Sequence, residues 1–118
     1  LILRKDFKSE GIKFFTKNNS EQQLGYMKRS KNYEIKRHLH LRRKREIMNT
    51  QEVLYIKSGE VSVDLYNQKM ELIENETLYQ GDFILLVSGG HGFRMNEDSE
   101  IIEIKQGPYL DGLDKKRF

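Results

Sequence analysis

The chain has 118 residues, of which 36% are hydrophobic and 33% are charged, so it is long enough for one domain with a small core under a polar surface. It contains no cysteine, which excludes disulfides and thiolate chemistry. Its longest uninterrupted apolar stretch, residues 83–87, is five residues long, whereas a membrane-spanning helix needs about 20. We therefore expect no membrane partner and a cytoplasmic location. The formal net charge of +3 is small, so we expect no nucleic-acid partner.

Alternating apolar and polar residues predict β-strands along most of the chain, from about residue 24 onward. Alanine, the strongest helix former, is absent, which disfavours a helical bundle. The expected strands cover residues 33–40, 53–56, 61–66, 70–77, 83–87, 91–95 and 100–105. Residues 57–60 form a connection of hairpin length between two of them. Helix or irregular structure is expected only in the first twenty residues and after Gly107. Short strands at about ten-residue spacing are typical of a sandwich or small barrel, so the predicted fold class is all-β.

The three histidines of the chain are the first candidates for a functional site. His38 and His40 are two residues apart on an expected strand, so both rings project from the same face. Two imidazoles in that arrangement can share one metal ion at about 2.0–2.2 Å each. His91 follows Gly89 and Gly90, which allow sharp turning and close backbone approach. By itself this spacing is a weak signal for a metal site, and three ordinary polar residues on a solvated strand are the alternative interpretation.

Around these histidines the sequence resembles the cupin superfamily, whose members are small β-barrels with a jelly-roll, or double-stranded β-helix, fold. His38 and His40 match the H-x-H of the first cupin motif, and Glu52 to Gly59 has its E-x6-G spacing. Twelve positions separate His40 from Glu52, more than the motif has, which implies an inserted loop. Glu46 lies nearer to His40 and is an alternative ligand, but it lacks the downstream glycine. The resemblance therefore favours Glu52 as the carboxylate of the site.

The second cupin motif is matched by Gly81 at its start, Gly89 at its inner glycine and His91 at its histidine. The resemblance covers residues 24–106. It implies a single domain with a barrel core over these residues, an N-terminal strand or extension over 1–23 and a tail over 107–118. The closing stretch, residues 103–109, is similar to a branch of small cupins that end in a KQGPY-type strand.

The resemblance implies that His38, His40, Glu52 and His91 hold one divalent transition metal, which is Fe, Mn, Ni, Zn or Cu. Three imidazoles and one carboxylate leave open coordination positions for water or substrate. The first hypothesis is a metal-dependent enzyme, of oxygenase or isomerase type, that acts on a small metabolite, for example an anionic one such as a sugar phosphate or keto acid. The second is a non-catalytic, metal-stabilised module that binds or senses a small ligand. The third is a metal-free epimerase or isomerase. The resemblance also implies a homodimer, because an open jelly roll has an exposed edge to cover.

A basic run lies inside the inserted loop, and its members are Arg42, Arg43, Lys44 and Arg45. If the barrel forms, this loop lies near the mouth of the pocket. Clustered guanidinium groups there would attract a phosphate or carboxylate group of a substrate. Arg42, Arg43 and Arg45 are therefore candidate substrate-binding residues. A solvated loop is the alternative interpretation of the same run.

Overall fold

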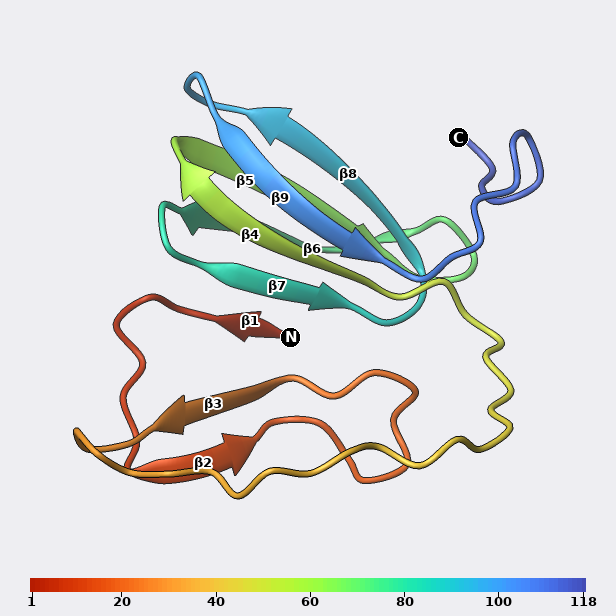
Figure 1. Cartoon of the computed structure of the whole chain (residues 1–118). Helices are drawn as coiled ribbons and strands as arrows, with labels where there is room; N and C mark the ends of the chain where they lie inside the picture. Colours follow the sequence, from red (N-terminus) through yellow and green to blue (C-terminus); the bar gives the residue numbers. More distant parts are fainter. The chain divides into compact units, whose positions relative to one another are not determined.

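The computed structural model describes all 118 residues and contains nine strands and no helix (Figure 1). The predicted all-β class is confirmed. The strands are β1 (Ile2–Leu3), β2 (Gly11–Phe14), β3 (Gly25–Lys28), β4 (Glu52–Ser58), β5 (Glu60–Tyr66), β6 (Leu72–Tyr79), β7 (Phe83–Leu86), β8 (Gly90–Met95) and β9 (Glu100–Lys105). The structure contains no helix that is long and apolar enough to cross a membrane.

The chain divides into two compact units. The sandwich unit comprises Leu1–Asp6 and Asn49–Phe118, and the hairpin unit comprises Phe7–Met48. Residues 24–106, the expected barrel core, include parts of both units.

Two antiparallel sheets form the sandwich unit. One has the strand order β1-β7-β4-β9 and the other β6-β5-β8. The register aligns Leu54 with Ile84 in the first sheet, and Val63 with Phe93 in the second. Both sheets keep open edges, and the strands do not close into a barrel.

The core lies between these two sheets and follows from the alternation of their strands. Leu54 and Ile56 of β4 face Val61 and Val63 of β5, and each of these side chains is at most 4% exposed. Leu78 and Ile84 complete the buried cluster. Because successive residues of a strand point to opposite faces, the even positions of β4 and the odd positions of β5 line the same interior.

The connection between β4 and β5 differs from the predicted hairpin. β4 pairs with β7 and β9, whereas β5 pairs with β6 and β8, so the chain passes from one sheet to the other at this point. Gly59 makes the change of direction with φ 88°. A Cβ at this position would overlap Ser99 and the carbonyl of Asp98. The prediction of a hairpin was wrong because β4 and β5 do not pair with each other. Their apolar faces pack against one another from opposite sheets of the sandwich.

Residues 33–40, which were expected to be a strand, have no regular secondary structure. Asn32 adopts φ 69°, and the Tyr33 amide donates to the Ser30 carbonyl at 3.2 Å, so a turn follows β3. Ile35 and Leu39, the apolar positions of the alternation, are 54% and 77% exposed. Alternation marks a potential strand, but a strand forms only with a partner to complete its backbone hydrogen bonds. No strand pairs with these residues.

The hairpin unit consists of β2 and β3 and the segments that flank them. The register aligns Gly11 with Lys28 at one end. The Phe7 ring stands edge-on to Phe15 and Tyr26, with centroids 5.1 and 5.3 Å apart. Strands β1 and β2 thus occupy part of the first twenty residues, where the pattern allowed helix or irregular structure and the resemblance implied a strand or extension. The tail after Gly107 has neither helix nor strand.

Asp82, in the turn between β6 and β7, joins the N-terminal residues to the second half of the sandwich unit. Its side chain is 3% exposed and accepts hydrogen bonds from Arg4 at 2.9 Å and from the amides of Lys5 and Tyr79 at 3.0 Å each. Burial by itself raises the pKa of Asp82, but the hydrogen bonds from Tyr79, Arg4 and Lys5 outweigh it and hold the pKa below its ordinary value. The ionised carboxylate therefore stabilises the position of β1.

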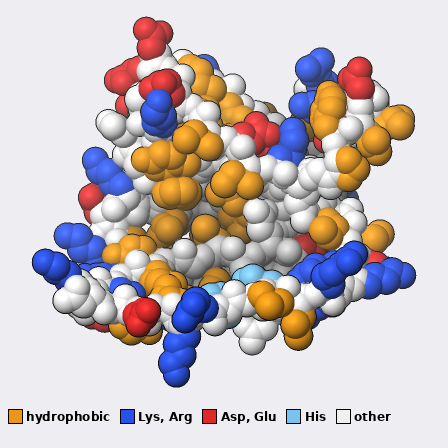
Figure 2. Space-filling model, viewed as in Figure 1, with side chains coloured by type: hydrophobic (Ala, Val, Ile, Leu, Met, Phe, Trp, Pro, Cys, Tyr) orange, Lys and Arg blue, Asp and Glu red, His pale blue; other side chains and the backbone are white.

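Apolar side chains gather on the outer face of the β1-β7-β4-β9 sheet (Figure 2). Tyr55 and Phe83 stack there with ring centroids 4.6 Å apart. Ile102 and Ile104 of β9 are 50% and 59% exposed. These side chains are the apolar surface that a second copy of the chain would cover in the predicted homodimer.

Candidate ligand and metal site

The first element of the candidate site is a contact between Glu52 and His91. Glu52 begins β4 and shares the inner face with Leu54, while His91 follows the first residue of β8 and shares the inner face with Phe93. The two strands belong to different sheets. His91 Nε2 lies 3.0 Å from Glu52 Oε2, and the two side chains are 31% and 16% exposed. An imidazole nitrogen and a carboxylate oxygen therefore meet between the sheets.

Lys105 extends this contact on the β9 side. It is the cross-strand neighbour of Glu52 and places its Nζ 4.0 Å from Glu52 Oε1 and 3.1 Å from Glu103 Oε1. The hydrogen bond to Glu103 raises the pKa of Lys105, and the negative charges of Glu103 and Glu52 raise it further. The ammonium group thus stays protonated beside Glu52.

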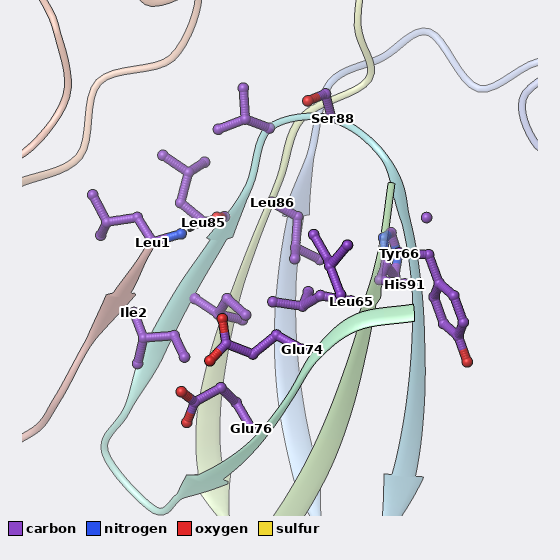
Figure 3. A pocket seen from close by; sticks show the side chains of 14 residues that line it. Leu1, Ile2, Leu65, Tyr66, Glu74, Glu76, Leu85, Leu86, Ser88 and His91 are labelled. Carbon is purple, nitrogen blue, oxygen red and sulfur yellow. Dashed lines mark hydrogen bonds between the residues drawn. The ribbon is translucent and has the colours of Figure 1, made fainter. Parts of the chain in front are cut away.

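A cavity of about 470 Å³ opens between the sheets on the side of β1, β6 and β7 (Figure 3). Most of its walls are aliphatic, and His91 lies at one end. The apolar lining includes Ile2, Leu65, Ile73, Ile84, Leu86 and Val87. A volume in this range suits a small organic ligand.

Two carboxylates on β6 also line the cavity. Glu74 and Glu76 pair with Leu65 and Val63 of β5 and so share the inner face with them. Figure 3 shows both side chains projecting from the strand into the same space as Leu65. Glu76 accepts a hydrogen bond from Arg4 at 3.0 Å, but no ion pair involves Glu74. Sequence reasoning missed these residues, although their spacing in register with buried Leu78 was a usable signal.

His38 and His40 belong to the hairpin unit, where both are exposed. Their ring centroids lie 5.4 Å apart in an edge-on arrangement. His38 Nδ1 lies 2.9 Å from the carbonyl oxygen of Lys36. A carbonyl oxygen can only accept, so Nδ1 is the donor in this contact and Nε2 is the ring nitrogen left for another partner. A backbone carbonyl at one ring nitrogen is a common second contact of imidazoles that ligate a metal through the other.

The structure thus brings the four predicted ligands together in pairs, Glu52 with His91 and His38 with His40. No group of three or more His, Asp or Glu side chains is gathered into a metal-binding arrangement. Glu46, the alternative carboxylate, is exposed in the hairpin unit. The four-ligand site stays a prediction from the sequence.

The Glu52–His91 pair fits a metal ion in its chemistry and its spacing. Imidazole nitrogen and carboxylate oxygen are both ligands of divalent transition metals. Two donors that are each about 2.1 Å from one ion, at a right angle to each other, lie about 3 Å apart. The observed separation of 3.0 Å matches that distance. The same separation is also that of an ion pair between a protonated imidazole and a carboxylate, which needs no metal.

The predicted substrate-binding residues Arg42, Arg43 and Arg45 are all exposed and form no ion pair. They belong to the hairpin unit, whereas every residue that lines the cavity belongs to the sandwich unit. Comparison with protein-family models, with curated proteins and with solved structures gave no match. The resemblance to cupins remains a prediction that rests on the motif residues themselves.

Proposed function

We propose that this protein is a cupin-type, metal-dependent small-molecule enzyme whose site is the cavity between the sheets of the sandwich unit. The observation that carries the proposal is that His91 belongs both to the cavity wall and to the contact with Glu52. Its side chain lines the cavity, and its ring nitrogen meets the Glu52 carboxylate from the facing sheet at 3.0 Å. Glu52 and His91 are the ligands that we assign from the sandwich unit, and the sequence predicts that His38 and His40 complete the set. A bound metal would supply Lewis-acid polarisation of a ligand oxygen.

Glu74 supplies the acid–base group that proton-transfer chemistry requires. It lines the same cavity as His91 and has no counter-ion, so its carboxylate is available to accept a proton from a bound ligand. This availability favours isomerase-type chemistry over the oxygenase type. Two carboxylates and no Lys or Arg side chain line the cavity, which favours a neutral, hydroxyl-bearing ligand over the anionic metabolite expected from the sequence.

The first prediction is that purified protein, loaded with Mn, Fe, Ni, Cu or Zn and then desalted, keeps about one ion per chain. Elemental mass spectrometry on the whole chain measures it. We expect Glu52→Gln and His91→Ala each to lose most of the ion, because each removes one of the proposed donors. Glu103→Gln is the matched control, since this carboxylate contacts Lys105 and not His91.

The outcomes separate the parts of the proposal. A wild-type chain that refuses all five metals, or a His91→Ala chain that keeps its ion, would contradict the metal site. Loss of the ion from the double variant His38→Ala/His40→Ala would support the four-ligand set. Retention in that variant would restrict the site to Glu52 and His91.

A second candidate function is a metal-free ligand-binding module, and the composition of the cavity favours it. Ile2, Leu65 and Leu86 present aliphatic walls that bind an apolar group without any ion. This candidate predicts that a ligand which raises the melting temperature does so equally after exhaustive chelation. The metal-dependent proposal predicts that chelation abolishes that shift.

A further inference from the structure

The small net charge of the chain hides a strong separation of charge between its two units. The hairpin unit has twelve Lys and Arg residues and four Glu residues, a formal charge of +8. The sandwich unit has nine basic and fourteen acidic residues, a formal charge of −5. The expectation of no nucleic-acid partner rested on the total of +3, which describes neither unit, and on the absence of aromatic residues within the basic run 42–45.

Most of this positive charge lies in residues 28–45, which we name the basic segment. It contains nine Lys and Arg residues and one acidic residue, Glu34. Every residue of the segment is exposed. Lys28 alone is neutralised, by an ion pair with Glu10, and Arg29 stacks over the Tyr33 ring at 4.5 Å. Eight cationic groups are thus left without a carboxylate partner in the protein.

The backbone of the basic segment suits a polymeric partner. After β3 ends at Lys28, no strand or helix forms before Glu52. The twelve residues that follow the turn, 34–45, reach about 40 Å when fully extended. A long row of charges that no carboxylate of the protein neutralises costs free energy by mutual repulsion, and a linear polyanion relieves that repulsion.

We infer that the basic segment binds the phosphodiester backbone of single-stranded nucleic acid. Arg and Lys side chains displace the counterions condensed on phosphates, and the guanidinium group matches phosphate oxygens with two hydrogen bonds. Between the cationic groups stand Tyr33, Leu39 and Leu41, which are 54%, 77% and 79% exposed. On a single strand the aromatic ring of Tyr33 can stack on an unstacked base, and Leu39 and Leu41 add apolar contact only, whereas in a duplex the base faces are covered.

An anionic membrane fits the same segment less well. Membrane-surface segments present a continuous apolar face, most often as an amphipathic helix. Here the segment is not helical, and the row that holds Leu39 and Leu41 is interrupted by Arg37 and Arg43. The charge arrangement therefore favours the nucleic acid.

The test is fluorescence anisotropy of the whole chain with a labelled oligo-dT of 20 nucleotides (about five times the smallest single-strand site sizes) between 50 and 200 mM NaCl. The variant Arg42→Gln/Arg43→Gln/Lys44→Gln/Arg45→Gln removes four exposed charges from the segment. Its matched control, Lys69→Gln/Arg94→Gln/Lys115→Gln/Lys116→Gln, removes four exposed charges from the sandwich unit. Both sets lie outside the core, so near-UV circular dichroism of both variants is expected to match the wild type.

We expect the segment variant to bind at least about tenfold more weakly at low salt, and the slope of log Kd against log[NaCl] to fall by about 3 for four lost phosphate contacts. The control variant is expected to change the affinity by less than about twofold. Equal weakening in both variants would reduce the effect to net charge and overturn the inference. So would equal competition by duplex DNA, absence of oligonucleotide binding, or binding to phosphatidylserine vesicles alone. The inference does not rest on the metal site, so metal content is expected to stay unchanged in both variants.

Discussion

The two units of the chain use their residues in opposite ways. The sandwich unit buries eight hydrophobic side chains and Asp82, and it pairs Arg4, Glu76, Glu52 and Lys105 with groups of opposite charge. The hairpin unit has no buried residue, and most of its cationic groups have no partner. Conformational stability therefore resides in the first unit, because burial of apolar surface is the main favourable term in folding. Recognition by charge is the property of the second.

The largest expected difference between the units is in their resistance to proteolysis. Trypsin cleaves after Lys and Arg, and we expect the first cuts of the folded chain to fall after residues 36, 37 and 42–45, where no strand protects the backbone. Lys57 and Arg94 lie within β4 and β8, so cleavage there requires that the ladders open. We expect rates at least about a hundredfold lower at these two sites. Mass spectrometry of timed digests measures the order, and simultaneous cleavage at Lys57 would contradict the division.

The next largest expected difference is between the effects of a core substitution and a surface substitution on the free energy of unfolding. Ile56 is fully buried, so Ile56→Ala leaves a cavity and is expected to lower the free energy of unfolding by about 2–5 kcal/mol. Leu39 loses a similar amount of side chain in Leu39→Ala, but it is 77% exposed, and we expect a change within about 0.5 kcal/mol. Urea denaturation followed by tyrosine fluorescence measures both. Comparable destabilisation would show that the hairpin unit contributes a core of its own.

Asp82→Asn is expected to have a smaller effect that depends on pH. The substitution removes a buried charge that three groups contact, so we expect a loss of about 1–3 kcal/mol at pH 7. Because the pKa of Asp82 in the folded chain lies below the ordinary 3.8, its stabilisation is complete above that value and is lost as the pH falls through the folded pKa. The difference in melting temperature between wild type and variant should therefore narrow only below pH 3.8.

Glu74→Gln is the control for the Asp82 experiment, since Glu74 has no ion pair and is exposed. Its melting temperature should stay close to that of the wild type at pH 7, because the substitution breaks no ion pair. A difference between wild type and Asp82→Asn that persisted unchanged at pH 2 would contradict the role assigned to the ionised carboxylate.

The local sequence was sufficient for the positions of several strands. The apolar runs 53–56 and 83–87 and the alternating residues 100–105 became β4, β7 and β9 with small changes at their ends. Burial on one face of a strand imposes a period of two, and that period is visible without any knowledge of partners. The motif resemblance also selected Glu52 and His91, which the structure brings into contact, while their role toward a metal stays a prediction.

The partners of the strands were decided only by the tertiary structure. Alternation shows which residues share a face, but it does not show which strand will complete the backbone hydrogen bonds. For this reason residues 33–40 have the pattern of a strand and remain unpaired, and β4 and β5 adjoin in sequence but belong to different sheets. The position of Glu74 in the cavity wall also depends on which strands pair. The opposite wall of the cavity is built by β1 and β7, which belong to the facing sheet. The period of a strand is a local property, whereas the identity of its neighbours depends on how the whole chain buries its apolar faces.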